Sequence, residues 1–530
     1  NPSRRRPVVP GDTTSRDPMP LETATAPHDR KAAWAKVIDH TRCIGCHACS
    51  TACKSENQVP LGVNRTYVKY VDVGLFPMAR RAFQVTRCNQ CEDPPCARAC
   101  PTAAMHQRPD GIVDFDKSIC IGCKACIAAC PYDAIFINPE DHSAEKCNFC
   151  AHRLDVGLEP ACVVVCPTQA ILVGDMNDPA SAVGETVGRQ PVAVRRPEKE
   201  THPKLFYVGA HQATLDPLAA SRPDGGLCMW SEQGDVPHGV PAGNPGHANS
   251  SAAAMLAYDV PHRAPWDHRV SLYTWTKSVS AGAYVATLLL LLLGMLEWSN
   301  PLWTLAAPLV ALAFLGLTGA ILIWDLEHPT RFHYLLLKPQ WRSWLVWGGF
   351  IISGYGAVLT AHLVAGWFGR PEFQRPLAIV GGPLGVMAAV YTAYLFAQAK
   401  ARDLWQSPLL PPHLAAQAVL AGSGAMLLVA SAVEPGAVRP LGWMFAGAGA
   451  THLLMTVGEI TLTHGTAHAH LATLEMTRGK YAIYFWISML LVAVGLAAPW
   501  FPRPATVAGL LGLLAFEHAY VQAGQSVPLA

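Results

Sequence analysis

The sequence predicts a multi-domain protein in which a cysteine-rich α+β domain is followed by an all-α polytopic membrane domain of eight transmembrane helices. Three observations support this prediction. Sixteen of the 17 cysteines in the 530-residue chain lie between Cys43 and Cys166. From about Leu272 onward the sequence becomes a series of apolar runs of about 20 residues, the length that a helix needs to cross a bilayer. A chain of this length is also too long to fold around one core.

Charge and hydropathy narrow the class of partner. A net charge of +2 with 15% charged residues offers no basic patch, so we expect no nucleic-acid partner. A mean hydropathy of +0.21 points instead to membrane lipid. Arg4 to Arg6 could begin a twin-arginine signal, but Pro7 and Pro10 stand where its apolar segment should follow, so no export signal is expected. A leader removed before Asn1 stays open.

Sixteen cysteines form four runs of four. The runs are Cys43–Cys53, Cys88–Cys100, Cys120–Cys130 and Cys147–Cys166, and the first and third share the spacing C-x2-C-x2-C-x3-C. Four thiolates are the usual ligands of a [4Fe-4S] cluster, because soft sulfur donors suit iron. We therefore expect four [4Fe-4S] clusters. The expected ligands are Cys43, Cys46, Cys49, Cys53, Cys88, Cys91, Cys96, Cys100, Cys120, Cys123, Cys126, Cys130, Cys147, Cys150, Cys162 and Cys166.

Other uses of these cysteines are less consistent with the pattern. Cys43 to His47 matches the C-x-x-C-H haem-attachment signature, but haem would leave the last two cysteines of a repeated run without a role. Spacings of two and three residues suit a metal centre better than a disulfide framework. A tetrahedral zinc site stays open for the last run, where two cysteine pairs are widely separated.

The segment 35–175 has the features of a duplicated bacterial ferredoxin. CPTAAM, CPYDAIF and CPTQAIL recur after three of the runs, and Asp39 and Asp116 each stand four residues before a CIGC. In such units the fourth cysteine of each run ligates the partner run's cluster. The expected pairing is nested, the first run with the fourth and the second with the third. Around this domain we expect an N-terminal extension, 1–34, and a linker or strap, 176–265, that contains the lone thiol Cys228.

Segment 266–530 is the predicted membrane domain. An even number of spans places both of its ends on the ferredoxin side. Ten Lys and Arg residues flank the spans on that side against four opposite. The positive-inside rule then predicts an inner (cytoplasmic) membrane protein with a cytoplasmic ferredoxin domain. The eight spans are expected at about 272–296, 302–324, 343–367, 377–399, 413–432, 441–463, 481–498 and 505–521.

Two segments of the membrane half carry a family resemblance. DLEHPTRFHYLLLKPQWRSWLVWG, 325–348, and the ending AGQSVPLA, 523–530, resemble the membrane anchor of polysulfide reductase and its NrfD-like relatives. Residues 35–175 resemble the four-cluster subunit that accompanies such anchors. The resemblance implies that the two are fused here. It also implies a molybdopterin-type catalytic subunit as partner and electron exchange with the quinone pool, menaquinone or ubiquinone. Because several relatives face the periplasm, the periplasmic side stays open.

A quinone site should combine hydrogen-bond donors with proximity to a cluster, so we expect it at the ferredoxin-side helix ends. Lys277 could instead snorkel to the interface, the tyrosines could belong to an interfacial belt, and Asp325 could form a loop-locking ion pair with Arg331 or Arg342. The quinone-site candidates are Tyr273, Lys277, Ser280, Asp325, His328, Tyr391 and Tyr394.

Histidines deeper in the membrane half raise two further possibilities. His452 and Glu459 share one face of the sixth predicted span and are candidates for a proton path, or for a buried polar pair that fastens helices. His362 and His452 lie at different depths, so haem b is not expected.

The preferred interpretation is an electron-transfer and membrane-anchor subunit of a respiratory oxidoreductase complex. The chain would perform only the quinone half-reaction, because no motif for chemistry on an external substrate is visible. The alternatives are a membrane-tethered ferredoxin without a quinone site and a cluster-driven ion transporter subunit.

Overall fold

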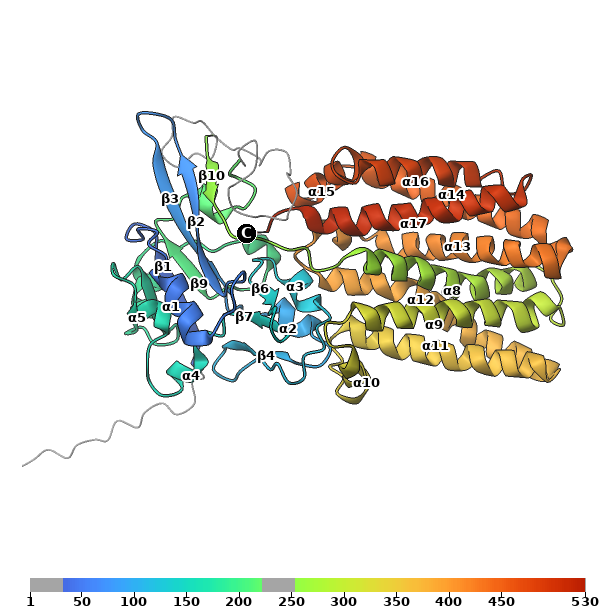
Figure 1. Ribbon diagram of the computed structural model, residues 1–530, viewed down its shortest axis with the longest axis horizontal. Helices are drawn as coiled ribbons and strands as arrows, with labels where there is room; N and C mark the ends of the chain where they lie inside the picture. The colour runs from blue at the N-terminus through green and yellow to red at the C-terminus, as the bar shows by residue number, and fades with distance from the viewer. Residues whose placement is uncertain (1–31, 222–252, 530) are drawn as a thin grey trace, which may run out of the picture.

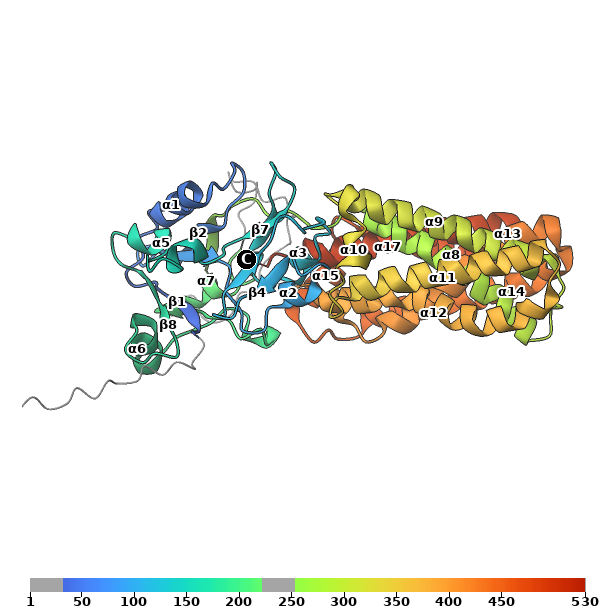
Figure 2. The same cartoon turned by 90° about the horizontal axis from the view of Figure 1, so that it is seen from below.

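The computed structural model describes residues 32–221 and 253–529, so Cys228 and most of the predicted N-terminal extension lie outside the described residues. Figures 1 and 2 show two bodies in line, a cysteine-rich body of short elements and a bundle of long, nearly parallel helices. The helices α2 (Pro95–Ala99) and α3 (Ala125–Ala129) lie at the end of the cysteine-rich body that faces the bundle (Figure 1). The second and third cysteine runs therefore meet the membrane half.

The cysteine-rich body has two three-stranded sheets and two hairpins in the part of the chain that the structure describes. The strands are β1 (Trp34–Asp39), β2 (Thr66–Val73), β3 (Arg80–Arg87), β4 (Met105–Gln107), β5 (Val113–Phe115), β6 (Ile135–Ile137), β7 (Ala144–Lys146), β8 (Ile171–Asp175), β9 (Leu205–Val208) and β10 (Met255–Tyr258). Strand β1 pairs antiparallel with β8 and parallel with β9, and β2 pairs antiparallel with β3 and β10. The predicted linker thus contributes β9 to one sheet and β10 to the other.

Short helices follow the cysteine loops. The predicted repeat has a structural counterpart, because Gly45 and Gly122, inside the two CIGC sequences, both have φ near +70°. His47 and Lys124 then take left-handed conformations and immediately precede α1 and α3 as their N-cap residues. The remaining helices of this half are α1 (Ala48–Asn57), α4 (Ala151–Leu154), α5 (Ala161–Val164), α6 (Ala182–Arg189), the 3-10 helix η1 (Pro197–Lys199) and α7 (Gln212–Leu215).

The membrane half has a long helix or helical segment at each of the eight predicted positions. In chain order its elements are α8 (His268–Leu292), the π-helical η2 (Leu302–Ala306), α9 (Ala307–Asp325), η3 (Pro329–Arg331), α10 (Tyr334–Leu337), α11 (Trp344–Trp367), η4 (Pro371–Phe373), α12 (Gln374–Gln398), η5 (Asp403–Gln406), α13 (Leu410–Val433), η6 (Pro435–Ala437), α14 (Val438–Thr461), α15 (Ala467–Thr477), α16 (Ala482–Gly495) and α17 (Pro502–Ser526).

Six helices of the described chain are long and apolar enough to cross a membrane. They begin at His268, Leu302, Trp344, Pro371, Leu410 and Pro502. Helix α16 is apolar but has only 14 residues, and α14 carries polar residues along its 24-residue length. A helical membrane domain is therefore supported, whereas the count of eight spans stays a prediction.

Glycines bring the two groups of membrane helices into close contact. Gly282 of α8 lies against Ala418 and Gly422 of α13, and a Cβ atom at either glycine would collide with the facing backbone. Small residues at a helix crossing allow such approach, and in lipid this packing replaces the hydrophobic effect as a source of helix association. Helices α8, α9, α11 and α12 thereby pack against α13, α14, α16 and α17, as Figures 1 and 2 show.

Candidate functional site

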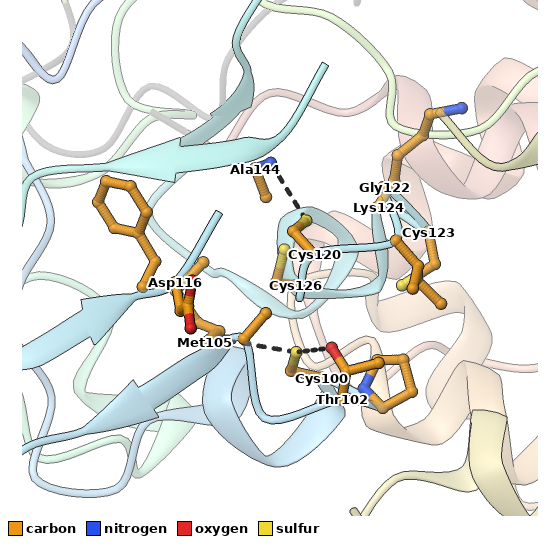
Figure 3. A pocket seen from close by; sticks show the side chains of 14 residues that line it. Cys100, Thr102, Met105, Asp116, Cys120, Gly122, Cys123, Lys124, Cys126 and Ala144 are labelled. Carbon is orange, nitrogen blue, oxygen red and sulfur yellow. Dashed lines mark hydrogen bonds between the residues drawn. The ribbon is translucent and has the colours of Figure 1, made fainter. Parts of the chain in front are cut away.

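None of the sixteen cysteines of the four runs forms a disulfide in the described structure. Most are buried, whereas Cys46, in the loop before α1, is exposed. The cavity shown in Figure 3 is lined by three sulfur-bearing residues of one run, Cys120, Cys123 and Cys126, together with Cys100 of the run before it. We call these four cysteines the inner set. A corresponding cavity holds the outer set, Cys43, Cys46, Cys49 and Cys166.

The other eight cysteines group in the same nested way. Burial raises the pKa of Cys53 to about 12, with Cys147, Cys162 and Cys150 as the neighbouring thiols that raise it further. These four form the second set. Burial followed by the neighbouring Cys88 raises the pKa of Cys130 to about 12. The third set is Cys88, Cys91, Cys96 and Cys130.

The arrangement of the sets bears on the choice between iron–sulfur clusters and single metal ions. Among the described residues, no group of three or more His, Cys, Asp or Glu side chains is placed to hold one metal ion. Zinc in the last run is disfavoured for a further reason, because Cys166 lies in the outer set, apart from Cys147 and Cys150. Backbone N–H groups point at the sulfurs: Met105 donates to Cys100 over 3.3 Å and Ala170 to Cys166 over 3.2 Å. Such donors stabilise an anionic iron–sulfur centre.

The sets follow one another in a row. Cys49 of the outer set neighbours Cys162 of the second, and Cys88 of the third neighbours Cys147 of the second. Cys126 of the inner set neighbours Cys96 of the third. The order is therefore outer, second, third and inner, and the inner set ends at the membrane half.

Cys162 of the second set has a different electrostatic environment from Cys53 in the same set. Burial raises its pKa, but the ammonium group of Lys36 and the guanidinium group of Arg87 outweigh this effect and lower the pKa to about 7. A negative charge is therefore favoured at this sulfur.

A cavity of about 220 Å³ lies directly beyond the inner set. Cys123 and Ile121 form part of its wall on the ferredoxin side, and the predicted residues Tyr273, Asp325 and Tyr391 form part of it on the membrane side. Most of the remaining wall is apolar. It is made by Trp266, Val270, Leu322, Ile323, Leu326, Phe332, Leu335, Leu336, Leu345, Ile352 and Leu395, with Gly319, Gly348, Gly349 and Ser353.

The alternative ion pair of Asp325 with Arg331 or Arg342 is wrong, because its carboxylate has other partners. Its carboxylate lies 3.6 Å from Lys124 Nζ and 3.4 Å from Arg269 Nε. Arg331 instead donates from Nη1 to the carbonyl oxygens of Lys117 and Cys120. The sequence could not reveal this exchange, because Lys124 belongs to the distant ferredoxin half.

Lys277 lies behind the cavity wall and is fully buried. The snorkelling alternative is therefore wrong: Nζ donates to the Ala389 carbonyl oxygen at 2.7 Å and to Thr392 Oγ1 at 2.8 Å. Nζ also lies 5.1 Å from the centre of the Tyr391 ring. Ser280 is farther along α8, where its hydroxyl donates to the Ala311 carbonyl oxygen at 2.8 Å, and it does not line the cavity.

His328 and Tyr394 are also outside the cavity lining. His328 Nε2 lies 3.4 Å from Ser143 Oγ and so joins the two halves. Tyr394 is 41% exposed and stacks on Trp344 with ring centres 4.5 Å apart. This position agrees with the interfacial-belt alternative for that tyrosine.

The candidate proton-path residues have separate contacts. His452 Nδ1 shares a 2.8 Å hydrogen bond with His413 Nε2 on α13, and its own Nε2 has no partner among the described residues. Glu459 instead neighbours Tyr520 of α17. His362 shares a 2.9 Å hydrogen bond with Tyr284, so His362 and His452 have different side-chain partners.

Sequence reasoning missed Glu517. This residue of α17 is 2% exposed, interacts electrostatically with Lys277, and leaves Oε1 without a hydrogen-bond partner in the described part of the chain. A carboxylate inside the apolar run LLAFEHAYV was a sufficient signal, because ionisable residues within spans are costly and usually functional.

The loop 325–348 clamps the inner set to the bundle. Gln340 N donates to the Pro101 carbonyl oxygen at 2.8 Å, and Ser343 Oγ donates to that of Ala99 at the same distance. Trp266 Nε1 donates to the Cys123 carbonyl oxygen at 3.3 Å. The inner set and the cavity are therefore held by one continuous interface.

These features define an iron–sulfur electron-transfer protein joined to a membrane domain. Residues 79–176 match the model of the 4Fe-4S dicluster domain family, and residues 258–513 match the polysulphide reductase NrfD family. The predicted fusion is thereby confirmed.

Relatives match the cysteine-rich half. One subunit of the tetrathionate reductase of Salmonella typhimurium is 44% identical over 35% of this chain and 76% of its own length. One subunit of the polysulfide reductase of Wolinella succinogenes is 43% identical over 33% of this chain and 93% of its own length. The arsenate respiratory reductase iron-sulfur subunit of a Shewanella species is 34% identical over 32% and 94%. The chain belongs to this family of iron–sulfur subunits and carries, in addition, an NrfD-like membrane anchor.

Proposed function

We propose that this chain relays electrons through four [4Fe-4S] clusters between a molybdopterin-type catalytic subunit and a quinone of the membrane pool. One observation carries the proposal: the cavity at the membrane surface has a cysteine of the inner set, Cys123, in one wall and the hydroxyl-bearing Tyr273 and Tyr391 in another. A bound quinone ring would thus lie next to the last cluster. When bound, the clusters supply the one-electron steps.

The sixteen cysteines of the four sets are the proposed ligands. Each set takes three cysteines from one run and one from its partner run, so each pair of clusters ties two distant segments together. The backbone N–H bonds to the sulfurs would favour cluster-bound thiolates over free thiols.

The proposed quinone site uses the apolar walls to hold the ring and the polar groups to orient it. The hydroxyl groups of Tyr273 and Tyr391 would donate hydrogen bonds to the quinone oxygens, and Asp325 would accept one from a quinol. Phe332 and Leu336 line the cavity and are each 40% exposed or more, so they would form a lipid-side entrance for a carrier.

Protons of the quinone reaction would pass through Lys277 and Glu517. Lys277 contacts the Tyr391 ring, and Glu517 is its buried electrostatic partner. His452, bonded to His413, and Glu459, beside Tyr520, would extend the path among α13, α14 and α17. Ser280 and His328 are proposed only as supports of this site, since neither lines the cavity.

The outer set is the proposed contact with the catalytic subunit, because Cys46 and Ile44 are exposed, Ile44 by 57%. The relatives' names indicate a partner that acts on a sulfur or arsenic compound. We further propose that α14 and α16 complete eight spans and that the ferredoxin half faces the cytoplasm, as the distribution of Lys and Arg favours.

The proposal is tested with Tyr391→Phe and Tyr273→Phe, separately and together, in purified protein that retains its iron. Quinol-linked reduction of the clusters should fall at least tenfold in the single variants, while reduction by dithionite stays unchanged. A tethered ferredoxin without a quinone site predicts no difference from the unsubstituted protein. An ion transporter predicts ion uptake by sealed vesicles during cluster reduction without added quinone.

A further inference from the structure

Two buried cations lie beside one sulfur of the second set. Arg87 Nη1 donates to Cys162 Sγ at 3.0 Å, and Lys36 Nζ lies 3.8 Å from the same sulfur. Both side chains belong to residues that are 2% exposed. Lys36 Nζ also lies 4.0 Å from the centre of the Phe149 ring. Two positive charges therefore share one sulfur ligand.

Arg87 has no carboxylate partner among the ion pairs of the described residues, and its Nε and Nη2 atoms have no hydrogen-bond partner there. Its strongest favourable charge interactions are with Cys162, Cys49 and Cys147. A buried, half-satisfied guanidinium is costly unless an anion compensates its charge. The counter-charge that this position calls for is a centre ligated by Cys162.

Asn57 adds a further donor to the same set. Its Nδ2 lies 3.7 Å from both Cys53 Sγ and Cys150 Sγ. The amide cannot turn the other way without loss, because Arg65 Nη1 donates to Asn57 Oδ1 at 2.8 Å and Arg65 is itself paired with Glu145. The orientation of this donor toward sulfur is therefore fixed.

The inner set has a different environment. Its sulfurs receive backbone bonds, from Met105 N to Cys100 and from Ala144 N to Cys120. The ammonium group of Lys124, next to Cys123 in sequence, turns away to the carboxylates of Asp325 and Glu327. Asp325 itself lines the cavity together with Cys123.

Resting on the proposed function, we propose that Arg87 and Lys36 act as positioning residues that give the cluster of the second set the highest reduction potential of the four. A cluster gains one negative charge when it accepts an electron, so nearby cations and N–H donors stabilise its reduced form more than its oxidised form. An electron would arrive from one neighbouring cluster and leave for the other. Between those steps it would rest one position from the outer end.

This placement suits a quinol, which gives up two electrons, because the row of clusters would carry one electron at a time. A first electron from a quinol would pass from the inner cluster through the third set to the second set. The inner cluster would then be free to accept the second electron. Storage near the outer end also places an electron beside the cluster that faces the catalytic partner.

The test is a potentiometric titration of the purified full-length chain, followed by electron paramagnetic resonance of the reduced clusters. The variants are Lys36→Met and Arg87→Gln, with Lys36→Arg as the charge-preserving counterpart. Arg189→Gln is the matched control, because it removes one positive charge whose side chain is 76% exposed. Cys150→Ser identifies the component that belongs to the second set.

The component that is reduced first as the potential is lowered should move to lower potential in Lys36→Met and further in Arg87→Gln. It should stay in place in Lys36→Arg and Arg189→Gln, and it should be the component altered by Cys150→Ser. If Arg87→Gln fails to fold, Lys36→Met decides alone. The proposal is overturned if no component moves in Lys36→Met, or if the one that moves is reduced later than another. An iron content of about four atoms per chain instead of about sixteen would reject the four-cluster function itself.

Discussion

In the cysteine-rich half, three members of the inner set, Cys120, Cys123 and Cys126, come from one short segment that carries its own geometry. In the membrane half, the cavity residues Tyr273 and Tyr391 come from α8 and α12, and only helix packing brings them together. The first kind of site is encoded by spacing, and the second by assembly. A substitution in the first should therefore remove a cofactor, and one in the second should change a rate.

The largest expected effect follows from removing a ligand at either end of the row. Cys123→Ala should lose the inner cluster, about four iron atoms of about sixteen, and should abolish quinol-linked reduction of the remaining clusters. Cys46→Ala should lose as much iron from the outer set yet keep quinol-linked reduction. Iron analysis and stopped-flow absorbance measure both. If quinol reduced the remaining clusters of Cys123→Ala at the wild-type rate, electrons would not pass from the cavity through the inner cluster.

The next effect tests the assembled site. Lys277→Met keeps the side-chain volume but removes the charge that lies over the Tyr391 ring. Loss of a proton-transfer group typically costs about 10²-fold in rate, so quinol-linked turnover should fall by about that factor while iron content and dithionite reduction stay unchanged. Lys480→Met is the control, because Lys480 is exposed. Equal turnover in both variants would remove Lys277 from the proton path.

These two predictions concern the two kinds of site, and the sequence revealed the first kind more fully than the second. The four runs predicted the cysteine sets because ligand spacing is a local property, and the nested grouping followed from the same repeat. The cavity was foreseen only in part. Tyr273, Asp325 and Tyr391 line it, whereas Tyr394 and Ser280 share a helical face with them but lie elsewhere, because depth and packing partners decide which residues of a face reach a cavity.

Charge partners on elements far apart in the sequence could not be predicted at all. Asp325 meets Lys124, which belongs to the other half, and Glu517 meets Lys277 across α17 and α8. Charge pairs of this kind depend on docking geometry, and a single sequence carries no record of it. The number of spans is limited in the same way, because the 14 residues of α16 are short for a lone crossing.

A smaller effect concerns the strap that joins the halves. His262 is buried between Asp133 and Asp259, its Nε2 3.1 Å from Asp259 Oδ1. Burial lowers its pKa, but Asp259 and Asp133 outweigh this and raise it to about 9. The resulting stability is complete below the unfolded-state pKa of about 6.5 and is lost as the pH rises through about 9.

The predicted loss on raising the pH across that window is about 3 kcal/mol, an order-of-magnitude figure from the pKa difference. Thermal unfolding of the detergent-solubilised protein at several pH values measures it. His262→Gln should be less stable than the unsubstituted protein at pH 6 and should show a flatter dependence up to pH 10. An equally steep dependence in the variant would assign the titration to another group.

The smallest expected effect concerns a single glycine, Gly122, where the two halves meet. Gly122 and Gly62 both have positive φ, +70° and +82°. A Cβ at Gly122 would collide with Glu327 of the clamping loop, whereas none of the described atoms lies within 4 Å of a Cβ at Gly62. Gly62→Ala therefore adds only backbone strain, about 1 kcal/mol. Gly122→Ala adds overpacking of about 1–3 kcal/mol at the interface as well.

The difference between these two variants isolates the docking of the halves from the folding of each half. Gly122→Ala should unfold at a lower temperature than Gly62→Ala. Its rate of quinol-linked reduction should also fall, because the inner set moves away from the cavity. Its iron content should stay unchanged, because the proposed cluster ligands Cys120, Cys123 and Cys126 remain in place. Equal unfolding temperatures and equal quinol rates would mean that the loop yields to the added methyl group, and that the two halves meet less tightly than the contacts of Lys124 and Arg331 imply.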